Sequence, residues 1–235
     1  MGTSGRRRTA LAGLVLALAT GCSSASHPSP PTGVDGLVIP TPSVDADDFV
    51  TGVDNPWLPL PVGATWRYDV TGSGAGTAVA TARQGPEVEG VATTALRTVT
   101  TPEGGGRRTV TTDLYAQDEA GNVWWLGREG EWRAGEDGAR AGLAMAAHPR
   151  QGDGYRQAYL PGEVDVRAEV LGVDLERTLP VGELDGLVAV TVTEATTGLT
   201  TRAWYAEGIG LVARDTVAGG PETQLGLVAY DEPQR

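Results

Sequence analysis

Among the side chains of this sequence, the carboxylates could take part in the widest range of reactions. The chain holds 30 Asp and Glu against 18 basic residues, all of them arginine. Two carboxyl groups about 5–9.5 Å apart can hydrolyse a glycosidic bond. The candidates are Glu131, Glu136, Asp137, Asp153, Asp165 and Glu169. Asp165 and Glu169, however, alternate with valine and alanine, a pattern that favours the outer face of a strand over a paired site.

Most other catalytic chemistries lack the residues that they need. The chain has no lysine, so it can use neither a Schiff-base mechanism nor the phosphate-binding lysine of a P-loop. Cys22 is the only cysteine, Ser73 lacks a G-x-S-x-G elbow, and His148 is the only histidine after His27. We therefore expect no catalytic residue, no metal ion and no cofactor, and we predict that the protein is not an enzyme.

The N-terminus has the pattern of an export signal. Arg6, Arg7 and Arg8 precede an apolar stretch, residues 10–19, that is too short to span a bilayer, which takes about 20 residues. The stretch ends in Leu18-Ala19-Thr20-Gly21-Cys22, which resembles a lipobox except that Ala19 stands where leucine is usual.

This resemblance implies that residues 1–21 are a lipoprotein signal peptide, cut between Gly21 and Cys22. Cys22 would then carry lipid, including palmitate, and hold the protein on the extracytoplasmic side of the cell membrane. The alternative is an ordinary secretory signal that is cut near Ala25, with loss of Cys22.

Composition divides the rest of the chain into two parts. Residues 22–50 begin with the cysteine that the lipobox resemblance implies is lipidated, and their high content of Ser, Pro, Thr, Gly and Asp predicts a disordered tether. The formal charge is −12, and removal of the three signal arginines would make it −15. Such a chain lacks the basic patches that phosphates need, so nucleic acid is excluded as a partner.

Residues 51–232 have the pattern of one β-rich domain with little helix. Apolar and polar residues alternate at 65–70, 163–170 and 187–193, and threonine-rich runs at 93–101, 109–112 and 191–201 also favour strands. Gly and Pro interrupt these runs at short intervals. Only residues 139–147 have a helical composition, weakened by Gly142.

The densest motif, Tyr115-Ala116-Gln117-Asp118-Glu119-Ala120-Gly121-Asn122-Val123-Trp124-Trp125, predicts a hairpin that turns at Gly121 and Asn122. Successive strand residues face opposite sides, so Trp124 and Trp125 cannot share a surface. We expect one of them in the core. The other, with Trp132, is a candidate for a groove or rim.

Two resemblances bear on the fold. The segment Asn55-Pro56-Trp57-Leu58-Pro59-Leu60-Pro61-Val62-Gly63-Ala64-Thr65-Trp66-Arg67-Tyr68, the hairpin and the closing Tyr205-Ala206-x-Gly208-Ile209-Gly210-Leu211-Val212 resemble an uncharacterised family of bacterial secreted proteins and lipoproteins. The closing segment is also similar to lipoprotein carriers of the LolA type, whose half-barrel sheet surrounds an apolar groove. We therefore expect a strongly curved antiparallel sheet or incomplete barrel.

Three functions are compatible with these patterns. The first is non-catalytic binding of an apolar ligand or an envelope protein on a concave face. The second is a carbohydrate or cell-wall binding module, and the third is a glycoside hydrolase that uses two carboxylates. The candidate ligand-facing aromatics are Trp66, Tyr68, Trp124, Trp125, Trp132, Trp204 and Tyr205.

Overall fold

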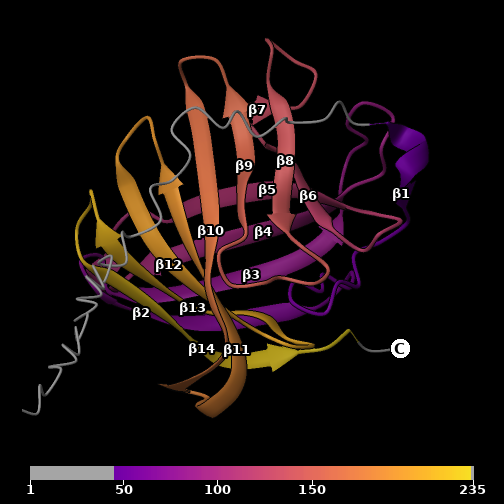
Figure 1. Ribbon diagram of the computed structural model, residues 1–235. Coiled ribbons are helices and arrows are strands. Elements are labelled where there is room, and N and C mark those ends of the chain that lie inside the picture. Colours follow the sequence, from indigo (N-terminus) through magenta and orange to yellow (C-terminus); the bar gives the residue numbers. More distant parts are fainter. Residues whose placement is uncertain (1–44, 234–235) are drawn as a thin grey trace, which may run out of the picture. The chain divides into compact units, whose positions relative to one another are not determined.

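Antiparallel strands make up almost all regular structure in the computed structural model, which describes residues 45–233 (Figure 1). The strands are β1 (Phe49–Val50), β2 (Thr65–Gly72), β3 (Gly76–Gln84), β4 (Thr94–Pro102), β5 (Thr109–Asp118), β6 (Val123–Arg128), β7 (Trp132–Arg133), β8 (Arg140–Met145), β9 (Gly154–Leu160), β10 (Val164–Leu179), β11 (Gly182–Glu194), β12 (Leu199–Ala206), β13 (Gly210–Ala218) and β14 (Thr223–Asp231). Two short 3-10 turns, η1 (Ala46–Asp48) and η2 (Glu103–Gly105), are the helical elements of this range. Among residues 45–233, neither turn has the length or apolarity of a membrane-crossing helix.

Twelve of these strands close into a barrel. Their order is β5-β4-β3-β2-β14-β13-β12-β11-β10-β9-β8-β6, and β6 pairs again with β5. The two-residue strands β1 and β7 pair with β5 and β6. The predicted mainly β fold with a strongly curved antiparallel sheet is confirmed, and the sheet closes completely through the β5–β6 hairpin.

Side-chain alternation along the strands separates the interior of the barrel from its surface. In β10, Val166, Ala168 and Val170 are buried, whereas Arg167 and Glu169 are exposed. Such alternation is what a barrel strand with a filled interior requires. The predicted strands at 65–70 and 187–193 lie within β2 and β11, and the predicted strand at 163–170 matches β10 from Val164 on.

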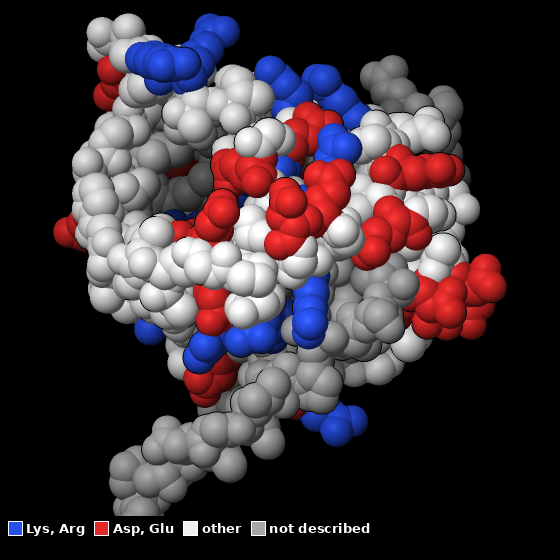
Figure 2. Space-filling model, turned by 90° about the horizontal axis from the view of Figure 1, so that it is seen from above, with Lys and Arg blue, Asp and Glu red and all other residues white. Residues whose placement is uncertain are grey.

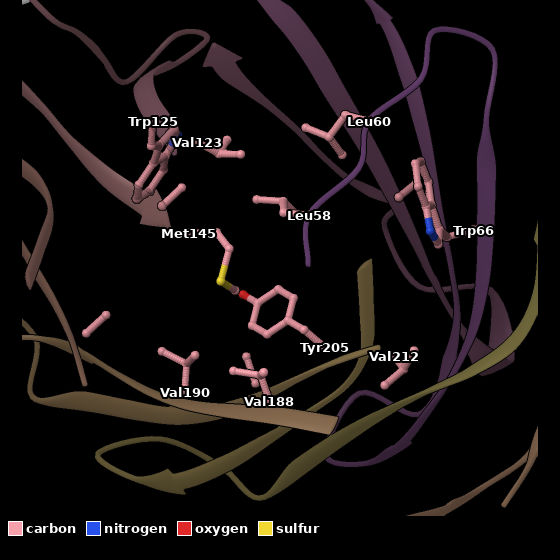
Figure 3. Packing of buried hydrophobic residues seen from close by; sticks show 14 of the residues in the cluster. Leu58, Leu60, Trp66, Val123, Trp125, Met145, Val188, Val190, Tyr205 and Val212 are labelled. Atoms are coloured by element: carbon pink, nitrogen blue, oxygen red, sulfur yellow. The ribbon is translucent and has the colours of Figure 1, made fainter. Parts of the chain in front are cut away.

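The segment 53–63, which we call the strap, runs across one end of the barrel. Its backbone is tied to the β12–β13 turn by a bond from Gly208 N to Pro56 O, and to β3 by a bond from Gly63 N to Ala82 O. Leu58 and Leu60 are 7% and 2% exposed. Figure 3 shows both side chains inside the barrel, between Trp66 on one side and Trp125 on the other.

Two buried amides hold the start of the strap. The Asn55 side-chain oxygen accepts hydrogen bonds from the backbone N–H groups of Trp57 and Leu58, and its Nδ2 donates to Gly121 O and Ala146 O. Gln117 Oε1, on β5, accepts from the N–H groups of residues 54 and 55. These bonds satisfy polar groups that would otherwise be buried without partners, and so fix the strap to the barrel.

A second apolar cluster lies outside the barrel wall. Residues 88–91 cover the outer faces of β4 and β5, burying Ala95, Leu114 and Leu126. Trp124 belongs to this outer cluster, where its ring packs edge-on against Phe49 at 6.3 Å between centroids. Trp125 points into the barrel. The two indoles therefore lie on opposite sides of β6, as strand geometry predicts.

The folded part begins earlier than expected. Residues 46–50, assigned to the tether from sequence, form η1 and β1. Phe49 is held by its contact with Trp124, and Glu119 N donates to Asp48 O. The signal peptide, Cys22 and the rest of the tether lie outside the described residues.

The expectation of a helix at 139–147 is wrong, because this segment contains strand β8, which pairs with β6 and β9. Alanine composition favours a helix locally, but two neighbouring strands supply hydrogen-bond partners and override that preference. Gly142, which weakened the helix, has a structural role here. A Cβ at this position would lie 2.2 Å from Arg156 O on β9.

We expect Gly142→Ala to destabilise the domain by about 1–3 kcal/mol, the usual cost of overpacking. Gly154→Ala is the matched control, because a Cβ there would meet its nearest atom at 3.9 Å and its φ is negative. Urea unfolding followed by tryptophan fluorescence measures both variants. Equal stability of the two variants would contradict the assigned close approach of β8 and β9.

Candidate functional site

The barrel encloses a cavity of about 320 Å³ between the strap and one side of the wall. Its lining residues are Leu58, Pro59, Leu60, Trp66, Tyr68, Ala80, Leu96, Thr98, Thr100, Thr111, Asp113, Tyr115, Arg128, Glu194, Ile209, Gly210, Leu211, Arg214 and Leu225. Figure 2 shows the molecule hollowed on the face that it views, with Asp and Glu side chains gathered beside the hollow. The volume lies near the lower end of the range for small-molecule sites, about 300–1,000 Å³.

Small inward side chains leave this space open. The inward positions of β3 are Gly76, Ala78, Ala80 and Ala82, all buried. Thr98 and Thr100 of β4 and Thr111 of β5 continue this wall. Protein interiors are normally packed without large voids. The opposite wall follows that rule, since valine, tyrosine and tryptophan side chains of β6 and β9–β12 fill it.

The end of the cavity nearest the strap is apolar. Leu58, Leu60 and Leu211 contribute aliphatic surface there, beside the indole of Trp66. The polar atoms of the two large aromatics are already satisfied, because Trp66 Nε1 donates to Ile209 O at 2.7 Å and Tyr68 OH donates to Leu211 O at 2.9 Å. These rings therefore present carbon surface to whatever occupies the cavity.

An ion pair lies on the β5–β6 side. Arg128 Nε lies 2.7 Å from Asp113 Oδ1, and the side chains are only 27% and 12% exposed. The Arg128 guanidinium also lies over the Trp125 ring, 5.0 Å from its centroid. Burial disfavours the charge of Arg128, but the adjacent Asp113 carboxylate outweighs this and raises the arginine pKa. Arg128 and Asp113 thus neutralise each other within the wall.

Arg214, on β13, is the second cation of the cavity. It lies near three interior phenols, those of Tyr68, Tyr115 and Tyr205. Burial raises the pKa of all three phenols, and the charge of Arg214 acts in the opposite direction on each. The three phenols therefore stay neutral at ordinary pH.

The seven aromatics that the sequence singled out are divided between three places. Trp66 and Tyr68 line the cavity. Trp125, Trp132 and Tyr205 are buried in the packed side of the interior, where the first two indoles meet edge-on at 5.1 Å between centroids. Trp124 and Trp204 face outward, so these two are not ligand-facing in the sense expected. Trp204 packs under the Arg177 guanidinium, 4.9 Å from its ring centroid.

Sequence reasoning missed the charged residues of the cavity. Asp113, Arg128, Glu194 and Arg214 were not among the candidates, and none of the six proposed carboxylates lines the cavity. Asp165, for example, accepts hydrogen bonds from Arg167 and Arg156 on the outer surface, and these partners lower its pKa. Asp113 and Tyr115 share the inward face of β5 with Thr111, but the outward face of this strand is buried as well, so alternation in the sequence does not mark them.

The interior phenols predict a loss of stability at alkaline pH. Their folded-state pKa values exceed the unfolded value of about 10, so the folded state binds more protons and stability falls as pH rises above about 10. Urea midpoints measured from pH 8 to 11.5 should therefore decline steeply above about pH 10. Tyr68→Phe removes one of these phenols and should make the decline shallower. A pH-independent midpoint across this range would contradict the assigned burial.

Comparison with known proteins finds only distant structural similarity. No family profile matches the chain, and no curated protein matches it. Among solved structures, an inferred exported protein with YmcC-like fold from Bacteroides fragilis is 12% identical, with a TM-score of 0.44, over 75% of this chain and 99% of its own. An inferred lipoprotein from Parabacteroides distasonis is 11% identical, with a TM-score of 0.43, over 76% of this chain and 100% of its own. At these values, neither structure says what this chain binds.

Proposed function

We propose that this protein is a non-catalytic binding protein of the cell envelope that holds one small, partly apolar molecule inside its barrel. The observation that carries the proposal is the cavity of about 320 Å³ with an apolar floor at the strap and polar groups further along its wall. A concave, largely apolar site with a few placed polar groups is the usual form of a small-molecule site.

The arrangement of the polar groups favours binding over chemistry. Asp113 Oδ1 lies 2.7 Å from Arg128 Nε, so the carboxylate is already engaged in an ion pair. Glu194 Oε2 accepts a hydrogen bond from the Thr197 hydroxyl at 3.1 Å. A glycosidase needs one carboxyl group that donates a proton. An arginine-bound carboxylate is a poor proton donor, so Asp113 and Glu194 do not make a convincing acid and base pair.

A carbohydrate module has less support. It would need a platform of exposed indoles, but Trp125 and Trp132 are 9% and 6% exposed. Trp124 is half-buried, and its Nε1 donates to Asp118 Oδ2 at 2.8 Å. Trp124 therefore contributes to the turn of the β5–β6 hairpin rather than to a flat sugar-stacking surface.

A cavity-filling substitution tests the proposed binding. Thr98→Phe places a ring in the cavity and should weaken binding of a small amphipath, such as 1-decanol, by about tenfold or more, equivalent to about 1.4 kcal/mol. A change in the wavelength or intensity of intrinsic tryptophan fluorescence reports binding, since Trp66 lines the same space.

The matched control is Val99→Phe, the neighbouring position on the outward face of β4, which should bind as the original chain does. Both substitutions are made in the full-length chain that carries Cys22→Ser. A chain without the lipid needs no detergent, which would otherwise compete for the cavity. Failure of the original chain to bind, or equal binding by both phenylalanine variants, would overturn the proposal.

The envelope location rests on the N-terminal sequence. The basic residues, the short apolar stretch and the lipobox-like segment before Cys22 together support export, cleavage and lipid attachment. We propose that this lipid holds the barrel at the membrane surface, with the polar segment after Cys22 as the spacer.

Replacement of Cys22 tests this placement directly. Cys22→Ala should abolish incorporation of labelled palmitate and move the protein out of the detergent phase in Triton X-114 partitioning. Ser24→Ala, two residues away, should retain both properties. Unchanged labelling of the Cys22→Ala variant would show that the lipid, if any, is attached elsewhere.

A further inference from the structure

Arg214 differs from the other arginine of the cavity in having no carboxylate partner. Arg128 has Asp113 at 2.7 Å and Glu131 at 3.6 Å. Within residues 45–233, no carboxylate oxygen lies within 4.0 Å of a guanidinium nitrogen of Arg214. A cation that projects into a cavity without a counter-ion attracts an anion from solution.

The position of Arg214 suits the head of an amphipathic molecule. It lies three residues along β13 from Leu211 of the apolar floor, or about 10 Å at about 3.3 Å per residue. Its inward orientation follows from its pairing with Ala203 and Leu225, which both face the interior. Arg214 remains exposed, so it can be reached from the open end of the cavity.

The surroundings of Arg214 strengthen an interaction with an anion. The phenols of Tyr68, Tyr115 and Tyr205 are buried and stay neutral because burial raises their pKa values. They therefore add no negative charge that would compete with a bound anion for the guanidinium. Glu194, at the end of β11, also lines the cavity, and its Oε2 accepts a hydrogen bond from the Thr197 hydroxyl at 3.1 Å.

We infer that the natural occupant is a single-chain anionic amphipath, with its apolar chain against Leu58, Leu60 and Trp66 and its anionic head on Arg214. This inference rests on the proposed binding function and adds the charge and shape of the ligand. The cavity, near the lower end of the range for small-molecule sites, favours one chain over the several chains of a membrane lipid. The planar fork of arginine can hold a carboxylate or a phosphate through two parallel hydrogen bonds.

The test compares probes of one chain length and different head groups. Decanoate, decyl phosphate, 1-decanol and decyltrimethylammonium are titrated below their micellar concentrations into full-length protein that carries Cys22→Ser. We expect the anions to bind about tenfold more tightly than the alcohol, because hydrogen bonds to charged groups exceed neutral ones. We expect the cation to bind most weakly. The better of decanoate and decyl phosphate identifies the head group.

Substitutions of Arg214 test whether this residue causes the preference for anionic probes. Arg214→Gln should lose the tenfold preference for anions over the alcohol, and Arg214→Lys should keep part of this preference because it keeps the charge. The matched control is Arg83→Gln, which removes one positive charge from an exposed position of β3 on the outer face. It should leave every affinity unchanged, which separates a local contact from an effect of net charge.

The outcomes separate a failure of this inference from a failure of the proposed binding function. If the alcohol and the anions bind equally, or if Arg214→Gln keeps the preference, the barrel binds apolar molecules but the anionic class is wrong. If no probe binds, both the inference and the proposed function fail. Circular dichroism and urea unfolding of each variant confirm that an observed loss does not come from a misfolded barrel.

Discussion

The need to fill the interior of a twelve-stranded barrel governs the rest of this structure. A barrel of about eight strands is just wide enough for its own side chains to fill, and a wider ring must find additional material or enclose a space. Here the ring closes through β5 and β6. Tryptophan and tyrosine side chains fill one side of it, and the strap adds Leu58 and Leu60 from outside the sheet. The remaining volume is the cavity.

The strap links this packing requirement to binding. It has no regular secondary structure over most of its length, so the side-chain and backbone bonds of Asn55 and Gln117 provide its order. Because Leu58 and Leu60 form the floor of the cavity, the same contacts that close the end of the barrel set the depth of the site. Any displacement of the strap would change both the buried core and the space available to a ligand.

Parts of this architecture could be predicted from sequence because they depend on local alternation. Strands β2, β10 and β11 alternate clearly, since one face meets the interior and the other meets water. The opposite orientations of Trp124 and Trp125 follow from the same geometry. In the β5–β6 hairpin, however, only Gly121 adopts the predicted positive φ, and Asn122 instead bonds to Asp118.

The polar part of the site could not be found in this way, for a physical reason. Strand β5 is covered on both faces, by the interior on one side and by residues 88–91 on the other, so Leu114 and Ala116 point outward although they are buried. Alternation cannot identify the inward face of such a strand. Asp113 and Arg128 therefore carry no sequence signal that separates an inward charge from a solvated one. The strap was visible only as a motif, because its interior position depends on closure of strands far away in the sequence.

The charges of the cavity differ in how firmly they are fixed. Asp113 and Arg128 satisfy each other, and replacement of either one would leave a partly buried charge, which is costly. This pair is therefore best understood as part of the wall. Arg214 carries no such constraint from a carboxylate of residues 45–233, and its charge remains available to a solute. A wall that neutralises one arginine and leaves the other open makes the cavity polar along its length, from an apolar floor to a cationic contact. Under the proposed function, this polarity would favour an amphipath over a plain hydrocarbon or a sugar.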